Sequence, residues 1–385
     1  MIHLPKEGLE TYEQVKDMAR TFANEYIRPH AERLDEEESF PADIYKQMGE
    51  YGLFGITVPT EYGGSGLDAY AYALVMEELS RGYASVADQC GVVELIGALL
   101  SKYGTDEQRE QYMTKILTNE LKVAYCITEA EAGSDVSGIR TTAEKTATGW
   151  KLSGDKQWIH NAPVADLGFV LACTDPDAGH RGMSIFIVDL NEKGVTRGPK
   201  DHKMGQCASQ ISALFFEDVE IPEDALLGEL NRGFYIMMSV LENGRVGIGA
   251  LSVGIAQAGL EASLEYVQVR KQFGKPLSEN QGIQWMLADM ATDVQAARSL
   301  VHRAAVMLDN DIAAGTACSM AKRFASDVAV NRTADAVQIF GGSGYIRGFE
   351  VERLYRDAKI TQIYEGTNQI QRNIIAKNLL KNGIN

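Results

Sequence analysis

One stretch of the chain contains a single carboxylate in a place that suits proton abstraction. In Tyr364-Glu-Gly-Thr-Asn-Gln-Ile-Gln371, Glu365 stands beside a glycine just before a helical pattern. A carboxylate can take a proton from a substrate when it is held next to the reacting carbon and its pKa is brought near the working pH. A Glu at this place could also simply decorate the start of a helix, so the stretch alone leaves both interpretations open.

A second stretch, residues 126–138, has the sequence Cys-Ile-Thr-Glu-Ala-Glu-Ala-Gly-Ser-Asp-Val-Ser-Gly. It follows a run that predicts a strand, and it supplies small residues, hydroxyl groups and exposed amides in one loop. Glycine lets the backbone approach a planar cofactor closely, and the polar groups can donate to ring heteroatoms or a phosphate. An acidic turn with ordinary capping explains the same residues, so this alternative stays open.

Two further stretches could hold phosphate groups. Residues 338–344, Gln-Ile-Phe-Gly-Gly-Ser-Gly, break two helical patterns, and residues 270–276, Arg-Lys-Gln-Phe-Gly-Lys-Pro, follow a long helical pattern. No preceding strand and no suitably spaced acidic residue accompany the glycines, which disfavours a dinucleotide-binding βαβ unit. Backbone amides and basic side chains could instead bind a pyrophosphate. A structural turn and a solvated helix end are the alternatives.

The composition is that of an ordinary globular protein. The chain has 385 residues, 45% of them hydrophobic, and a formal net charge of −16. The length predicts two or three domains, and the charge disfavours nucleic acid and anionic membranes as partners. No apolar run reaches the roughly 18 residues of a membrane helix, and charged residues stand where a signal peptide is apolar. We therefore expect a cytoplasmic protein without membrane insertion. The five scattered cysteines, with no CxxC pair, predict no metal site.

The pattern of elements changes twice along the chain. Helical spacing of apolar residues gives way to short β-rich runs separated by Gly, Asp, Asn and Pro, and then to long segments rich in Ala, Leu, Met, Gln and Arg. We predict an N-terminal all-α domain at 1–122, a central β domain at 123–232 and a C-terminal helical domain at 233–385.

Taken together, the four stretches resemble the acyl-CoA dehydrogenase family in sequence, order and spacing, over essentially the whole chain. Residues 126–138 fit the family's first motif at every restricted position, and residues 338–357 fit its second except at Gly348, where an acidic or amide residue is usual. The resemblance implies an α+β fold with an N-terminal helical domain, a central β-barrel-like domain and a C-terminal four-helix bundle. It also implies FAD as cofactor, an acyl-CoA substrate, a homotetramer, and electron-transferring flavoprotein or a similar acceptor as partner.

The resemblance assigns roles by position. Glu365 matches the base that takes the α proton while the β hydride passes to flavin N5. The family's other position for this base is occupied here by Gly244, so Glu365 is the only candidate at either position. The expected FAD contacts are Thr128, Ser134, Trp158, His160, Gln281, Thr367 and Gln369, together with Arg270, Phe273, Gln338 and Gly342, which match residues that reach a neighbouring subunit's FAD. The expected substrate contacts are Ser134, Glu242, Arg245, Tyr364, Gly366 and Asp88.

Two departures from the family bear on the substrate. His160 stands where Thr or Ser is usual near flavin N5, and it could donate to the flavin, donate to a polar acyl group, or be satisfied by its neighbours. Asp88 falls in a stretch that lines the far end of the acyl pocket, usually with small or apolar groups. An unpaired buried carboxylate is costly, so Asp88 either faces water, meets a cation or belongs to the chemistry. If it enters the pocket, we expect a short, branched, cyclic or polar acyl group rather than a long fatty chain.

Other functions fit the same scaffold. It could run as an enoyl-CoA reductase or an acyl-CoA oxidase, because the sequence does not determine the direction of electron flow. It could also persist as a non-catalytic flavin- or CoA-binding homologue. The intact Glu365-Gly366-Thr367 favours an enzyme that abstracts the α proton of a thioester.

Overall fold

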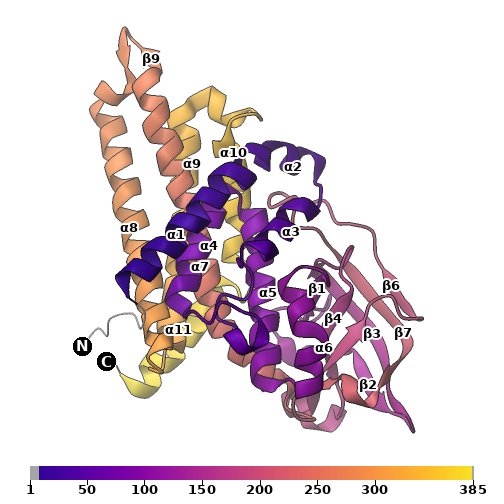
Figure 1. Cartoon of the computed structure of the whole chain (residues 1–385). Helices are drawn as coiled ribbons and strands as arrows, with labels where there is room; N and C mark the ends of the chain where they lie inside the picture. The colour runs from indigo at the N-terminus through magenta and orange to yellow at the C-terminus, as the bar shows by residue number, and fades with distance from the viewer. Residues whose placement is uncertain (1–7, 384–385) are drawn as a thin grey trace.

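The computed structural model describes residues 8–383, which form a helical N-terminal part, a β-rich middle and a helical C-terminal part. Figure 1 shows the N-terminal helices in the centre of the molecule, between the sheet on one side and the long C-terminal helices on the other. The first strand begins at Val123 and the longest helix at Gly233, so the changes in sequence pattern coincide with changes of element type.

The N-terminal part consists of six helices, two of which are almost completely buried. They are α1 (Leu9–Phe22), α2 (Ala31–Glu37), α3 (Ala42–Glu50), α4 (Ala69–Gly82), α5 (Ala84–Tyr103) and α6 (Asp106–Leu117). The side chain of Asp68 caps α4 by accepting a hydrogen bond from the Ala71 amide. Helix α5 is apolar on nearly all sides, as expected for a helix enclosed by other elements.

Contrary to the expectation from the sequence, two helices in residues 8–383, α5 and α7 (Gly233–Val269), are long and apolar enough to cross a membrane by length and composition alone. In their most apolar windows, 83% of the residues of α5 and 89% of those of α7 are buried inside the protein. Because their apolar surface is already covered by the fold, both are core helices.

The middle part is one mixed sheet with strand order β6-β7-β3-β2-β4-β5-β8, and β1 pairs in parallel with β4. The two longest strands, β3 and β7, pair antiparallel. The strands are β1 (Val123–Cys126), β2 (Thr142–Lys145), β3 (Gly149–His160), β4 (Leu167–Cys173), β5 (Met183–Asp189), β6 (Val195–Arg197), β7 (Ile211–Pro222) and β8 (Leu226–Leu227).

Strand β4 lies between two apolar cores. Its residues Phe169 and Leu171 pack into the large helical core, whereas Val170 and Ala172 pack into a smaller core enclosed by the sheet. Successive side chains of a strand point to opposite faces, so burial on both faces accounts for the nearly continuous apolar run of β4. The strands thus curve around a core of their own, while the helices cover the outer face of β4.

The C-terminal part is built on α7, which other helices approach very closely. A Cβ added at Gly254 would lie 2.0 Å from Ser80 Oγ of α4, and one added at Gly247 would lie 2.2 Å from the Tyr72 hydroxyl oxygen. Glycine at these positions therefore lets α4 pack against α7. The remaining elements are β9 (Lys271–Gln272), β10 (Lys275–Pro276), α8 (Gln281–Asp309), α9 (Gly315–Phe340), η8 (Gly341–Tyr345), α10 (Glu350–Lys359), η9 (Ile360–Gln362) and α11 (Asn368–Asn382).

A buried ion pair fastens the loop that follows β1. Lys156 of β3 is fully buried and donates hydrogen bonds to the Ile127 carbonyl oxygen at 2.9 Å and to Glu129 Oε1 at 2.8 Å. Glu129 also accepts hydrogen bonds from the backbone amides of Arg140 and Thr141. The pair therefore ties both ends of the loop to β3.

We expect Lys156→Met to destabilise the fold by about 3 kcal/mol, because the Glu129 carboxylate is then left buried without its cation. The double variant Lys156→Met/Glu129→Gln has no lone charge and should recover part of this loss. Urea unfolding followed by tryptophan fluorescence measures the midpoint of each variant. A single variant as stable as the wild type would contradict the assignment.

Candidate active site

The predicted base lies in a strained turn between η9 and α11. Glu365 and Gly366 have φ values of 51° and 88°, in the left-handed region. This conformation is natural for glycine but costs a residue with a Cβ roughly 1 kcal/mol or more. Gln371 Nε2 donates hydrogen bonds to the carbonyl oxygens of Glu365 and Gly366, at 3.3 and 2.9 Å. Contacts to the turn therefore stabilise a conformation that Glu365 would not adopt by itself.

The half-buried Glu365 side chain places one carboxyl oxygen out of contact with water, among charges of both signs. Its Oε2 atom is buried and has no hydrogen-bond partner within residues 8–383. Burial raises the pKa of Glu365 to about 7, and the Asp88 carboxylate acts in the same direction, while Lys322 and Arg245 oppose the shift. A carboxyl group with a pKa near neutral pH can both be ionised and accept a proton strongly. This environment is therefore suited to a general base.

The space for this carboxylate depends on Gly244 of α7. A Cβ built on Gly244 would lie 2.5 Å from Glu365 Oε2 and 3.1 Å from Leu95 Cδ2. Non-bonded atoms do not approach to 2.5 Å, so a side chain at position 244 and the carboxylate in its present place exclude each other. Glu365 and Gly244, the two base positions expected from the family resemblance, thus lie in contact with each other in this fold.

Glu242 and Arg245, which flank Gly244 on the same turn of α7, lie close to α9. Glu242 Oε1 lies 2.6 Å from where a Cβ of Gly315 would stand. Arg245 Nε is buried and has no acceptor among the residues that the structure describes. A buried guanidinium nitrogen without a partner can bind an oxygen of a ligand.

Two polar side chains, Asp88 of α5 and His160 at the end of β3, lie on another side of Glu365. Asp88 accepts a hydrogen bond from Ser209 Oγ at 2.9 Å, and its Oδ2 lies 3.5 Å from His160 Nδ1. Burial lowers the pKa of His160, so the imidazole is neutral at pH 7. Its Nε2 atom is buried and without a partner in the described part of the chain. Burial and, next, the Asp88 charge raise the pKa of both Tyr364 and Glu365, so Asp88 belongs to the same cluster.

The loop after β1 and the end of β3 form a face that suits a flat cofactor. The Thr128 carbonyl oxygen accepts a hydrogen bond from the Gln157 amide at 2.9 Å, which holds this loop beside Trp158. Trp158 has a φ of 55° and is 58% exposed, and Ser134 is exposed on the loop. An open indole, loop hydroxyl groups and the unpartnered nitrogen of His160 fit a ring system with polar heteroatoms.

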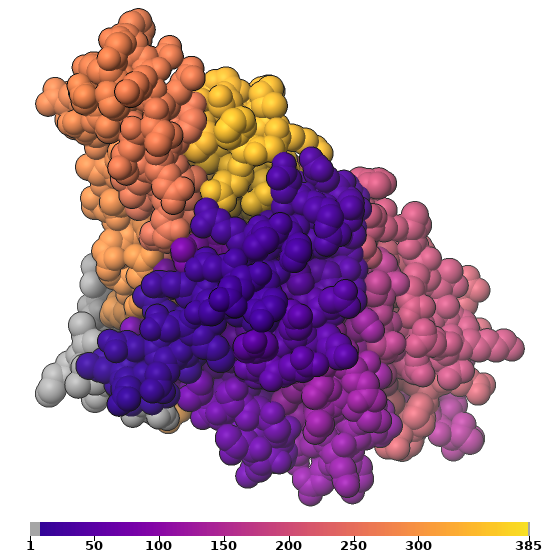
Figure 2. All heavy atoms as spheres, turned by 45° about the horizontal axis from the view of Figure 1, so that its top comes forward, coloured from indigo at the N-terminus to yellow at the C-terminus, as the bar shows by residue number. Residues whose placement is uncertain are grey.

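The other predicted FAD contacts are divided between two places. Thr367 caps α11, where its hydroxyl accepts a hydrogen bond from the Ile370 amide, and Gln369, two residues further on, is exposed. Figures 1 and 2 place the β9–β10 hairpin at the opposite end of the bundle, where it stands clear of the sheet. Phe273 at the tip of this hairpin is 98% exposed. The fold does not bring this end of the molecule to Glu365. The predicted contacts at this end are Arg270, Phe273, Gln281, Gln338 and Gly342.

Sequence analysis missed three groups around Glu365. Lys322 lowers the pKa of Glu365, and the Glu365 charge adds to the burial that raises the pKa of Tyr72 and Tyr125. Lys322 is fully buried in α9. Lysine in a helical pattern usually marks the solvent side, which is why it attracted no attention. The sequence feature that could have indicated its burial is the stripe of small residues on the same helix face, at positions 318, 321, 325 and 329, all of which are buried.

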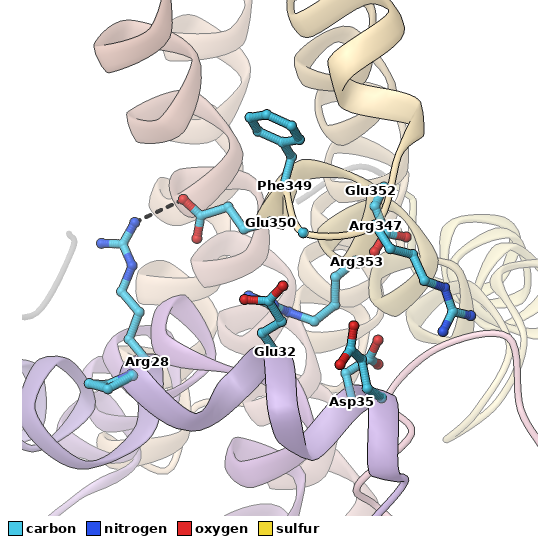
Figure 3. Close-up of a pocket in the computed structure, with 11 residues that line it drawn as sticks. Arg28, Glu32, Asp35, Arg347, Phe349, Glu350, Glu352 and Arg353 are labelled. Atoms are coloured by element: carbon cyan, nitrogen blue, oxygen red, sulfur yellow. Dashed lines mark hydrogen bonds and ion pairs between the residues drawn. The ribbon is translucent and has the colours of Figure 1, made fainter.

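A separate charged cavity of about 200 Å³ lies between α2 and the start of α10. Figure 3 shows Glu32 and Asp35 of α2 facing Arg353 across it, and Arg28 pairs with Glu350 at 2.9 Å. Its lining residues do not include the candidate base, so it is not the site of proton abstraction. The cavity also contains Gly348, whose φ of 97° is a conformation natural for glycine.

Three family models match consecutive parts of the chain. The acyl-CoA dehydrogenase N-terminal domain matches residues 9–120, the middle domain residues 124–219 and the C-terminal domain residues 231–380. The chain belongs to the acyl-CoA dehydrogenase family. This confirms the predicted fold class, and it identifies the protein as an FAD-dependent oxidoreductase of this family.

Individual relatives cover almost the full length of this acyl-CoA dehydrogenase. An acyl-CoA dehydrogenase of Bacillus subtilis is 45% identical over 96% of this chain and 98% of its own. The caffeyl-CoA reductase-Etf complex subunit CarC of Acetobacterium woodii is 42% identical over 97% of this chain and 99% of its own. The structure of butyryl-CoA dehydrogenase from Megasphaera elsdenii has a TM-score of 0.94 and 37% identity, covering 98% of this chain and 100% of that one.

We expect Gly244→Ala to slow flavin reduction at least about tenfold, because the new methyl group displaces the Glu365 carboxylate. Alanine favours the helix, so the fold and FAD content should be kept. Gly259→Ala, on the same helix, is the matched control, since its Cβ would meet ordinary contacts of 3.5 Å and longer. Anaerobic stopped-flow absorbance measures the rate of flavin reduction in both variants. Equal rates in Gly244→Ala and Gly259→Ala would show that a side chain at position 244 does not displace the Glu365 carboxylate.

Proposed function

We propose that this acyl-CoA dehydrogenase introduces a double bond between the α and β carbons of an acyl-CoA thioester, with Glu365 as the base for the α proton. The observation that carries the proposal is the buried Oε2 atom of Glu365, which has no partner within residues 8–383, in a carboxyl group whose pKa burial raises to about 7. An unactivated α C–H is a very weak acid, so the thioester oxygen must be stabilised as the proton leaves. We place this oxygen at the backbone N–H of Glu365, in an arrangement of the oxyanion-hole type.

The chain's own residues would hold both ligands around this base. Thr128, Ser134, Trp158 and His160 would bind the flavin, with Thr367 and Gln369 beside them at the start of α11. When bound, FAD accepts the β hydride. We assign Glu242 and Arg245 to the pantetheine arm of the substrate, with Ser134, Tyr364 and Gly366 around the thioester and acyl group. Arg245 Nε, which is buried without an acceptor in the described chain, supports this assignment.

We further propose a homotetramer in which the hairpin end of each bundle completes a neighbour's FAD site. The almost complete exposure of the Phe273 ring supports this arrangement, because an aromatic side chain at 98% exposure gains from being covered. Arg270 and Gln281 near the hairpin, and Gln338 and Gly342 at the end of α9, would then contact the adenosine diphosphate part of that FAD.

The acyl group is proposed to be short, branched, cyclic or polar. Asp88 lies close enough to Glu365 and Tyr364 to influence both electrostatically, and His160 faces it at 3.5 Å. An aliphatic tail packed against this carboxylate would remove it from water without a compensating charge. This cost argues against a long fatty chain.

Electron-transferring flavoprotein is the proposed redox partner, in the cytoplasm, and the opposite direction of reaction is the second candidate. The relative named as a subunit of a caffeyl-CoA reductase-Etf complex favours both ideas. In the reductive direction Glu365 would return the proton to the α carbon. Fast turnover with electron-transferring flavoprotein and slow turnover with oxygen would distinguish either reaction from an oxidase.

We expect Glu365→Gln to retain FAD and acyl-CoA affinity but to lose flavin reduction and α-proton exchange by a factor of roughly 10³ or more. The amide has the same shape as the carboxylate but cannot accept the proton. Exchange is followed by NMR in D₂O, and affinity by the spectral change on titration with a product thioester. Exchange at the wild-type rate would show that another group is the base.

We expect short, branched, cyclic or charged thioesters to bleach the anaerobic wild-type enzyme faster than octanoyl-CoA. Asp88→Ala should raise the relative rate with octanoyl-CoA about tenfold, because the desolvated charge is gone. Ser209→Ala, which removes only a hydrogen bond to Asp88, is the control. Octanoyl-CoA reacting faster than every other thioester with the wild type would overturn the substrate proposal.

A further inference from the structure

We propose that Lys322 is a positioning residue for the dehydrogenation: it holds the turn that carries Glu365 and supplies the positive charge that opposes Asp88 across that carboxylate. Lys322 lies in the middle of α9, 43 positions before Glu365 in the sequence, and is fully buried. The proposal deepens the proposed function, on which its catalytic consequence rests.

The contacts of Lys322 point to the turn. Its Nζ donates hydrogen bonds to the Gly366 carbonyl oxygen at 2.9 Å and to Asn368 Oδ1 at 3.2 Å. Both acceptors lie within three residues of Glu365. A buried ammonium group is costly to desolvate, so a lysine placed here must be compensated by its surroundings. The compensation comes from the segment that carries the base.

The segment that accepts these hydrogen bonds has a strained backbone, which the bonds help to stabilise. Glu365 and Gly366 have consecutive positive φ angles of 51° and 88°. Asn368 extends the attachment, since its Nδ2 donates to Ser326 Oγ at 2.9 Å and to Asp327 Oδ1 at 2.8 Å. Side chains of α9 therefore hold the turn, and Lys322 is the one whose charge also acts on Glu365.

The electrostatic environment of Glu365 contains few formal charges. Asp88 of α5 is the like charge, and Arg245 of α7 and Lys322 of α9 are the opposite ones. The tyrosines of the cluster are neutral, because burial raises their pKa values well above 10. Lys322 itself is affected by Glu365, Arg245 and Asp327, and burial lowers its pKa to about 8. It therefore carries its charge at neutral pH. The neutral groups are Tyr72 of α4, Tyr125 of β1 and Tyr364 next to the base.

Lys322 can be replaced without leaving its two hydrogen-bond acceptors unpaired. Without it, the Gly366 carbonyl oxygen still accepts a hydrogen bond from Gln371 Nε2 at 2.9 Å, and Asn368 Oδ1 still accepts one from Ser326 Oγ at 3.2 Å. Methionine fills nearly the same volume as the lysine stem without a charge. The hydrogen-bond acceptors of Lys322 are neutral, so its removal leaves no direct ion-pair partner without a cation, and Lys322→Met should therefore fold.

We expect Lys322→Met to raise the midpoint of the Glu365 titration by about one pH unit, because a positive charge beside the carboxylate is lost. The rate of flavin reduction should then rise with pH over a correspondingly higher range. Lys322→Arg restores a charge and should return the midpoint toward the wild-type value. Gln371→Met removes the other hydrogen bond to the same carbonyl without changing charge, so it should slow reduction while leaving the midpoint in place.

Two measurements keep the outcomes separate. Infrared difference spectra against pH report the protonated carboxyl band of Glu365 directly, with Glu365→Gln to assign it, and stopped-flow bleaching reports the catalytic profile. A midpoint in Lys322→Met that is unchanged or lower, or an equal shift in Gln371→Met, overturns the proposal. If Lys322→Met is insoluble, Lys322→Gln takes its place with the same expectation. Failure of every thioester to bleach the wild type would contradict the proposed function. The infrared titration would still show whether Lys322 lowers the titration midpoint of Glu365.

Discussion

The burial of one carboxylate is the constraint around which the helical parts of this protein are arranged. Glu365 has lost the solvation that would hold its pKa near its ordinary value, and burial contributes more to the shift than any neighbouring charge. Such a group is unstable in the interior unless its surroundings are fixed. Helices α5, α7 and α9 each contribute a charged residue to these surroundings, so the environment of the base exists only when all three are packed.

Close packing makes this possible, and glycine on α7 is central to it. At Gly247 and Gly254 the missing side chains admit α4, and at Gly244 the missing side chain admits the carboxylate itself. Glycine in α7 therefore allows close helix packing at two positions, and at the third it leaves room for the proposed base. A single long helix can serve both purposes because its successive turns face different neighbours.

The site also separates its tasks in space. The proposed flavin-binding face belongs to the sheet and the loop that Lys156 and Glu129 hold against it, whereas the proposed base belongs to the helical part. Asp88 and His160 lie where these two regions meet. The selectivity proposed for the acyl group is thus a property of the junction between domains, where a change of one side chain alters the pocket without disturbing either core.

The amino-acid sequence by itself determined the order of helical and β-rich parts, because periodicity and turn residues report local structure directly. Through the resemblance of its motifs to the acyl-CoA dehydrogenase family, it also led to Glu365 as the candidate base, because the family's other base position holds Gly244. Tertiary structure alone decided that Gly244 leaves room for Glu365, that Asp88 and Glu365 share one cluster, and that Lys322 is buried beside the turn. These relationships join residues that are distant in the sequence. A lysine or aspartate has the same local signature whether its helix face meets water or another helix, so only packing could distinguish the two.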